Sequence, residues 1–378
     1  MTELKTEGLT TFELIEIFAK LIGDPNHKTA LMLWGLTGTG KSQIQRQVLK
    51  RICTQKSWQP GVGEHVTGAL ELIGDWGLID LRVSLLEPTD LRGLPDLSGK
   101  TTRWIPPDEL PLIGSESRFP ERGILFLDEL THAQPTMQSA CFSLVLDRRC
   151  GPHVLLPGWK IVAASNYSTE NSYTYQMSEP LRGRFENYHL RCSLEAFKRW
   201  GIEHNIDQRI LAFLNWNPDY LHKPGASSEH GFPTPRSWTN ASYSLHNIKN
   251  GHLKEVLASN IGPGAAGMFH GFIQVFNSPE MSVNIPNMLN GKEESPKMTL
   301  QKPAVAWAFA ASIAGHVKEN PKLLVPAIKY FCHEVWADAL EIGRTGLSDL
   351  KYIVGKEAFI VAYAPFVGDV QKRYGQVL

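Results

Sequence analysis

The sequence predicts an α/β fold in which a mostly parallel, five-stranded sheet lies between two layers of helices, followed by an all-helical region. Helical patterns or long connections separate short apolar runs, which is typical of a parallel sheet that is covered on both faces. Beyond Cys192, helical patterns continue without strands. The expected strands are Ala30–Trp34, Leu78–Val83, Gly123–Leu127, Lys160–Ala164 and Tyr188–Leu190.

The chain has 378 residues, enough for about two or three domains. We expect an αβα domain over residues 1–192, a helical domain over residues 193–300 and a helical C-terminal extension over residues 301–378. Apolar residues at helical spacing predict helices over Leu194–Trp216 and Leu323–Ile342.

The composition is that of an ordinary globular protein, with 42% hydrophobic and 20% charged residues. No apolar run approaches the roughly 18 residues that a membrane helix needs, and the acidic start lacks a secretory pattern, so we expect a cytoplasmic protein. Lysine plus arginine and aspartate plus glutamate are equal, at 38 each. A nucleic-acid partner is therefore not favoured, although a neutral protein can still line a channel with lysines.

A glycine-rich motif follows the first expected strand and precedes a helical pattern. Its residues match G-x-x-x-x-G-K-[ST], the phosphate-binding P-loop; they are Gly35, Leu36, Thr37, Gly38, Thr39, Gly40, Lys41 and Ser42. The glycines let successive N–H groups face a phosphate, and the helix N-terminus adds its positive dipole end. We expect Lys41 to reach the β- and γ-phosphates of ATP and Ser42 to hold Mg²⁺.

Two acidic residues end the strand Gly123–Leu127, at the same edge of the sheet as the P-loop. Asp128 and Glu129 in this position form a Walker B arrangement. We expect Asp128 to bind Mg²⁺ through water and Glu129 to polarise the water that attacks the γ-phosphate.

The order of these motifs, with Ser165-Asn166 at the end of the next strand, resembles the AAA+ ATPases. By that resemblance, Asn166 is sensor 1, which orients the attacking water against the γ-phosphate. Leu181-Arg182-Gly183-Arg184-Phe185 resembles the arginine-finger segment, and Arg184 is the expected finger, with Arg182 as the alternative. Thr234-Pro235-Arg236 resembles sensor 2, in which Arg236 contacts the γ-phosphate from a helical lid.

Two further segments resemble inserts of the MoxR-like branch of this family. Glu87–Pro95 with Arg103–Pro111 is similar to the insert region, and Cys150–Trp159 has the form of a hairpin before sensor 1. The resemblance covers roughly residues 25 to 250. Because both segments place Trp or Lys in loops framed by Gly and Pro, we expect Lys100–Trp104 and the Cys150–Trp159 hairpin to face a ring axis or a partner.

The resemblance implies an ATP hydrolase that remodels a protein partner. An arginine finger requires a neighbouring subunit, so a homo-oligomeric ring is implied, of six subunits by resemblance. The implied partner class is a protein with a von Willebrand factor A domain. Two alternatives stay open, a DNA-acting motor such as a translocase or helicase, and a nucleotide-dependent scaffold that does not hydrolyse ATP.

Overall fold

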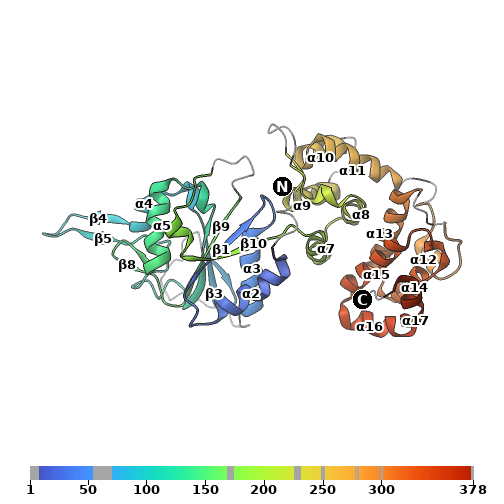
Figure 1. Ribbon diagram of the computed structural model, residues 1–378, viewed down its shortest axis with the longest axis horizontal. Helices are drawn as coiled ribbons and strands as arrows, with labels where there is room; N and C mark the ends of the chain where they lie inside the picture. Colours follow the sequence, from blue (N-terminus) through green and yellow to red (C-terminus); the bar gives the residue numbers. More distant parts are fainter. Residues whose placement is uncertain are drawn as a thin grey trace. The chain divides into compact units, whose positions relative to one another are not determined.

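The computed structural model describes residues 8–53, 70–167, 174–224, 231–247, 252–276, 278, 281–296, 298 and 301–375 (Figure 1). The chain folds into two compact units, Met1–Ser193 and Leu194–Leu378. The first unit holds a parallel sheet with helices on its faces, and the described part of the second is helical. The predicted fold class is thus confirmed. The division of residues 193–378 into a lid and an extension stays a prediction.

The central sheet has six strands in the order β10-β1-β9-β6-β3-β2. The five predicted strands are present and parallel to one another, while β2 is an additional edge strand that pairs antiparallel with β3. The strands are β1 (Ala30–Gly35), β2 (Leu70–Ile73), β3 (Trp76–Arg82), β6 (Arg122–Asp128), β9 (Trp159–Ser165) and β10 (Phe185–Leu190).

The strand that the sequence prediction missed, β2, pairs with β3 through a two-residue turn at Gly74-Asp75. Gly74 has a φ of +63°, a conformation that glycine adopts without strain. Strand β2, with the sequence Leu-Glu-Leu-Ile, is short and half exposed, as suits an edge strand. The Gly-Asp pair between two apolar runs was the signal available for this hairpin.

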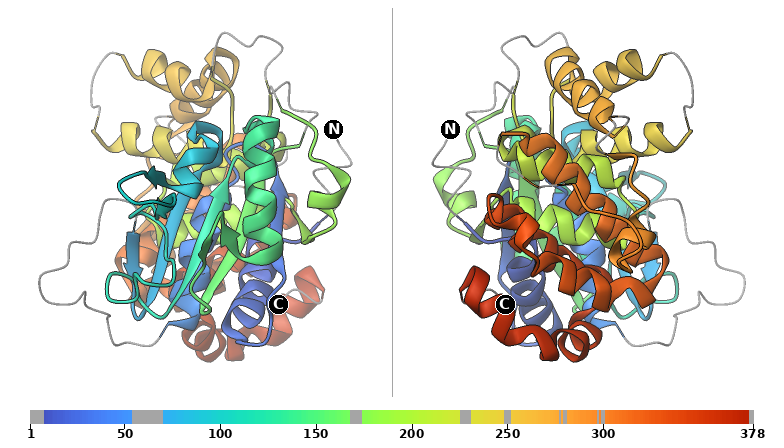
Figure 2. Two further views of the ribbon diagram at one scale, coloured as in Figure 1. Left: turned by 90° about the vertical axis from the view of Figure 1, so that its left-hand side faces the viewer. Right: turned by 90° about the vertical axis from the view of Figure 1, so that its right-hand side faces the viewer.

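Alternate residues of the strands point to opposite faces of the sheet, and each face has its own hydrophobic core. Helices α2 (Thr11–Gly23) and α3 (Lys41–Ile52) cover one face, where Leu33 and Phe126 are buried. Helix α5 (Pro135–Asp147) covers the other face (Figure 2). This alternation is what buries both sides of a parallel sheet.

The indole of Trp159 lies across two neighbouring strands at the start of β9. A Cβ atom on Gly77 would come within 2.6 Å of the indole, and one on Gly123 within 2.7 Å. Trp159 is fully buried, and its Nε1 donates to the carbonyl of Pro120 at 2.9 Å. Trp159 therefore packs within its own domain. The expectation that the hairpin as a whole faces a ring axis or a partner stays a prediction. The hairpin itself consists of β7 (Arg149–Cys150) and β8 (His153–Val154).

A two-stranded ribbon, β4 (Leu94–Asp96) and β5 (Arg103–Ile105), projects from the αβα sandwich (Figure 1). It follows the short helix α4 (Pro88–Arg92). The guanidinium of Arg92 lies 3.8 Å from the ring centroid of Trp104, so one face of this tryptophan is covered from within the chain. The side chain of Arg92 also contacts the β7–β8 turn, where a Cβ on Gly151 would come within 2.8 Å of it. One arginine thus joins the two inserts.

The described part of the second unit is an assembly of helices. Its helices are α7 (Leu194–Glu203), α8 (Gln208–Trp216), α9 (Pro235–Asn247), α10 (Leu253–Ile261), α11 (Pro263–Val275), α12 (Ile285–Leu289), α13 (Pro303–Glu319), α14 (Leu324–Phe331), α15 (Leu340–Val354), α16 (Lys356–Tyr363) and α17 (Val367–Tyr374). Phe213, on α8, packs in tilted and edge-to-face contacts against aromatic rings of α9 and α11. A second cluster packs α13 to α17 around Phe331 and Trp336.

Two of the expected helices are interrupted. The predicted helix over Leu194–Trp216 divides into α7 and α8 because Asn205 adopts a left-handed conformation and Asp207 caps α8. The predicted helix over Leu323–Ile342 divides into α14 and α15 around a turn that buries Trp336. No helix in the described ranges is long and apolar enough to cross a membrane.

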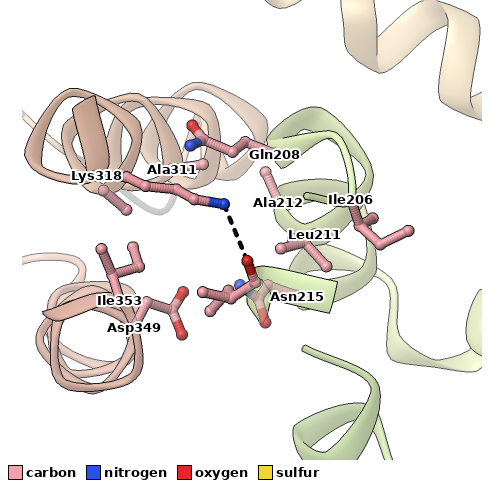
Figure 3. Close-up of a pocket in the computed structure, with 11 residues that line it drawn as sticks. Ile206, Gln208, Leu211, Ala212, Asn215, Ala311, Lys318, Asp349 and Ile353 are labelled. Atoms are coloured by element: carbon pink, nitrogen blue, oxygen red, sulfur yellow. Dashed lines mark hydrogen bonds between the residues drawn. The ribbon is translucent and has the colours of Figure 1, made fainter. Parts of the chain in front are cut away.

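A buried ion pair joins two helices of this unit that lie far apart in the sequence. Lys198 Nζ lies 2.6 Å from Asp349 Oδ1, so α7 is tied to α15. Burial raises the pKa of Asp349. The charge and hydrogen bond of Lys198 lower this pKa, and a hydrogen bond with Asn215 lowers it to a smaller extent. Asp349 and Lys318 border a cavity of about 30 Å³ (Figure 3). That volume accommodates about one or two water molecules. Lys318 Nζ donates to the carbonyl of Ile202 at 2.9 Å.

Candidate nucleotide-binding site

The P-loop connects β1 to α3 at the carboxyl edge of the sheet. Gly38 and Gly40 have φ values of +73° and +87°, which side chains other than glycine rarely adopt. Thr39 Oγ1 donates to the carbonyl of Leu36 at 2.7 Å and so closes the loop on itself. The glycines are thus present where the backbone requires them, directly before the first turn of α3.

Lys41 brings the P-loop and the sensor 1 position together. Its side chain is largely buried, and its Nζ donates to the carbonyls of Gly35 at 2.9 Å and Leu36 at 3.1 Å. The same Nζ donates to Asn166 Oδ1 at 2.6 Å. Two residues that are 125 positions apart, and that were predicted from separate motifs, therefore touch. A γ-phosphate bound by Lys41 would lie within reach of Asn166.

The two residues expected to hold Mg²⁺ are also in contact. Ser42 Oγ donates to Asp128 Oδ2 at 2.9 Å, which joins the first turn of α3 to the end of β6. A hydroxyl and a carboxylate are hard oxygen donors, which Mg²⁺ prefers, so the residues present fit this ion. The described residues contain no cluster of three or more His, Cys, Asp or Glu side chains suited to a metal. The remaining ligands would be water and phosphate oxygens, as is usual for Mg²⁺.

A second carboxylate increases the negative charge beside this pair. Burial raises the pKa of Asp80 on β3, and the negative charge of Asp128 raises it further. Arg46, whose Nη2 lies 3.9 Å from Asp80 Oδ2, lowers this pKa. The charge of Asp128 thus disfavours ionisation of Asp80, as expected for two neighbouring carboxylates.

Glu129 is held in an unusual backbone conformation, with φ of 59° and ψ of 34°. Few residues other than glycine adopt this region, and such strain is concentrated at functional sites. Its N–H donates to Asp128 Oδ1 at 2.9 Å, and its Oε2 accepts from Ser84 Oγ at 2.6 Å. The carboxylate is thus held from the short 3₁₀ turn that follows β3, the strand that pairs with β6.

Together, the strand order, the P-loop geometry and the contacts of Lys41 and Ser42 agree with one family. Residues 30–185 match the AAA domain family, dynein-related subfamily. The matched segment runs from the start of β1 to the start of β10, so it includes the P-loop, Asp128, Glu129 and Asn166. The sheet therefore belongs to an AAA+ P-loop fold. No curated protein matches the chain.

Solved structures similar to this chain include NtrX from Brucella abortus in complex with ATP, at 13% identity and a TM-score of 0.36, covering 81% of this chain and 64% of that one. A mutant of RuvB from Thermotoga maritima has 14% identity and a TM-score of 0.35, covering 83% and 84%. The Thermotoga maritima RuvB Holliday junction branch migration motor has 12% identity and a TM-score of 0.35, covering 79% and 80%. Similarity at this level carries no argument about function. The chain spans only 64% of the length of the NtrX chain.

The arginines near the end of the AAA domain lie far from its own P-loop. Arg184 precedes Phe185, which pairs with Ala30 at the start of β1, whereas the P-loop follows Gly35 at the other end. A strand of this length spans about 17 Å. The fold therefore does not bring Arg184 to the P-loop of the same chain.

The two candidate fingers differ in their surroundings. Both are exposed, and Arg182 Nη2 lies 3.7 Å from Glu179 within the short helix α6 (Glu179–Arg182). No carboxylate among the described residues pairs with Arg184. Arg184 is thus the more available of the two.

Arg236, the expected sensor 2, lies in the helical unit. It is exposed in the first turn of α9, which starts with a reciprocal cap between Thr234 and Ser237. A positive charge at a helix N-terminus opposes the dipole unless an anion is near. Its contact with phosphate stays a prediction.

Sequence reasoning missed Ser84, because no motif marks it. It lies just beyond β3, whose Arg82 pairs with Asp128 of β6. Knowledge of the β3–β6 register would have identified a hydroxyl next to Glu129. The sequence alone gives the strands but not their order, so this partner could not be predicted.

Proposed function

We propose that this chain is an ATP hydrolase of the AAA+ class, in which Lys41 binds the phosphates and Glu129 activates water. The observation that carries this proposal is the contact of Lys41 with Asn166, because it joins the phosphate-binding lysine to the residue expected to orient the attacking water. Ser42 and Asp128 would hold Mg²⁺, which stabilises the charge that develops on the phosphates. Asn166 would align the water that Glu129 polarises.

The test is ATP turnover by the purified chain with Mg²⁺. Glu129→Gln should keep ATP affinity and lower kcat by about 10²- to 10⁴-fold, because the amide keeps the shape and loses the base. Lys41→Ala should instead weaken ATP binding. Glu121→Gln is a matched control, since Glu121 is an exposed glutamate directly before the other end of β6. Turnover of Glu129→Gln at the wild-type rate would contradict the assignment.

We further propose that the chain works in a ring, in which Arg184 reaches the γ-phosphate of a neighbouring subunit. Its separation from the P-loop of its own chain, and its lack of a carboxylate partner among the described residues, support this role. By resemblance the ring has six subunits. Arg236 would contact the same phosphate from the helical unit and couple nucleotide state to the position of the lid.

The partner we propose is a protein, as in the MoxR-like branch, with a von Willebrand factor A domain protein as the class that the resemblance implies. The projecting ribbon supports a protein partner because it exposes apolar side chains. Leu94, Leu97 and Ile105 are 66%, 73% and 56% exposed, and Leu94 pairs with Ile105 across the two strands. Clustered exposed apolar groups mark protein contacts more than contacts with nucleic acid. Stimulation of turnover by duplex DNA would instead favour a DNA-acting motor.

A further inference from the structure

Two buried hydroxyl groups lie directly behind the candidate catalytic residues. Ser165 ends β9 and Thr131 lies in the 3₁₀ turn after β6, and they are only 1% and 4% exposed. Their Oγ atoms are 2.5 Å apart, and the N–H of Thr131 donates to Ser165 Oγ at 3.0 Å. Each hydroxyl is thus satisfied by the other residue.

This pair continues the connection between β6 and β9 beyond the last paired residues. The backbone pairing of β6 with β9 ends at Leu127 and Ala163, and beyond these residues the two strands separate. Glu129 then takes its left-handed conformation, and Asn166 leaves the sheet. Beyond the paired backbone, the hydroxyl groups of Thr131 and Ser165 join the segments that follow β6 and end β9.

Thr131 is also held through its carbonyl. The N–H of Tyr175 donates to it at 2.7 Å, from the segment that leads to α6. Met177 and Leu181 of that segment belong to the same hydrophobic core as Leu130. The position of Thr131 is therefore fixed by its N–H, its hydroxyl and its carbonyl, which makes it a rigid support for the turn after Glu129.

We infer that Thr131 and Ser165 are positioning residues that set the separation between the Glu129 carboxylate and the Asn166 amide. This inference rests on the proposed ATP hydrolysis. Ser165 directly precedes Asn166, and Thr131 follows Glu129 by two residues, so a lost hydroxyl bond would let both functional groups shift. A shift of about 1 Å in a reacting geometry can lower a rate about 100-fold. The printed bonds of the two hydroxyls go to each other and to the N–H of Thr131, not to a P-loop residue, so we expect ATP affinity to be kept.

The experiment measures steady-state ATP turnover and ATP affinity for Thr131→Val and Ser165→Ala. We expect kcat to fall about 10- to 100-fold while KM and Kd for ATP change less than about twofold. The double variant should be no worse than Ser165→Ala alone, because Ser165→Ala already removes the hydroxyl bond that Thr131→Val removes, together with the bond from the Thr131 N–H. Thr131→Ser, which keeps the hydroxyl, should retain most of the wild-type kcat.

Ser115→Ala is the matched control. Ser115 is a 5% exposed serine in the same unit, and its hydroxyl bonds within a turn to the carbonyl of Leu112. A merely structural hydroxyl of this kind should lower the melting temperature without changing kcat. If Thr131→Val does not fold, Ser165→Cys replaces the hydroxyl by a slightly larger thiol, which is a weaker hydrogen-bonding group, and its kcat should be intermediate.

The inference is overturned if wild-type protein hydrolyses ATP and the Thr131 and Ser165 variants keep its kcat, or if their effects are additive. It is also overturned if they resemble Ser115→Ala, with lower stability alone. Wild-type protein that binds ATP without hydrolysing it overturns the proposed function and this inference together. The two failures are therefore distinguishable by the wild-type rate.

Discussion

The two units of the chain differ in how accessible their interacting charged and polar side chains are. In the AAA domain, Lys41, Asp128 and Asn166 meet at the carboxyl edge of a sheet, and the two acceptors stay partly exposed. In the helical unit, Lys198 and Asp349 neutralise each other inside the packed helices. The first arrangement leaves groups accessible to a ligand, while the second uses its charges to join α7 to α15. Buried charge alone therefore does not identify a site; convergence at an accessible edge does.

The largest effect on ATP turnover should come from Arg184, an exposed arginine of the AAA domain. Arg184→Ala should keep ATP binding and lower kcat about 10³-fold or more, because an arginine finger neutralises charge in the transition state. Arg182→Ala, with its carboxylate neighbour Glu179, is the control and should have a much smaller effect. Phosphate release measures both rates.

Mixed rings separate a role in trans from a structural role. Rings that combine Arg184→Ala subunits with Lys41→Ala subunits should recover some turnover, at interfaces where an intact P-loop meets an intact finger. Absence of recovery in verified mixed rings would indicate that Arg184 is structural, or that Arg182 is the finger.

The next largest effect tests the ion pair of the helical unit. Lys198→Met leaves Asp349 as a buried, uncompensated charge, and such a change costs about 3–5 kcal/mol of unfolding free energy. Urea denaturation should show this loss, while the AAA domain still binds ATP. Arg51→Met is the control, because the Arg51–Glu16 pair is more than 60% exposed on both sides and contributes little. Full stability of Lys198→Met would mean that the pair is not a structural element.

A smaller effect is expected at the partner of Glu129. Ser84→Ala removes the hydroxyl that holds the Glu129 carboxylate, and kcat should fall about tenfold, which corresponds to about 1.4 kcal/mol. The affinity for ATP should not change. Ser139→Ala, at an exposed serine of α5, is the control. An altered ATP affinity without a change in kcat would show that Ser84 acts on binding instead.

The smallest effect on hydrolysis is expected in the ribbon, which lies outside the site. Replacing Leu94 and Ile105 by serine should leave basal ATP turnover within about twofold and abolish remodelling of a protein partner, since exposed apolar groups mark protein contacts. Trp104→Ala should also spare turnover and should lose a stacking contact with Arg92 of about 0.5–1 kcal/mol. Equal loss of basal turnover and remodelling would show that the ribbon only stabilises the fold.

The sequence predicted the AAA domain better than the helical unit, for a physical reason. A P-loop requires glycines at fixed spacing, and parallel strands bring their carboxyl ends to one edge, so Lys41 and Asp128 could be placed without coordinates. The contact of Ser84 with Glu129 could not be predicted, because it depends on the register of β3 against β6. Strand β2 was missed because the Gly-Asp turn signal before β3 was overlooked. Helices that pack by general apolar patterns leave no comparable signature. The interruption before α15 arose from the burial of Trp336, a tertiary effect that local periodicity does not encode.

The large indole at the start of β9 has a consequence for how this sequence can vary. Trp159 occupies the space in which side chains at 77 and 123 would lie, so either glycine can change only if the tryptophan becomes smaller. Conversely, loss of the tryptophan alone would leave a cavity over two bare strands. The three positions therefore depend on one another: the glycines at 77 and 123 make the room that a large residue at 159 fills.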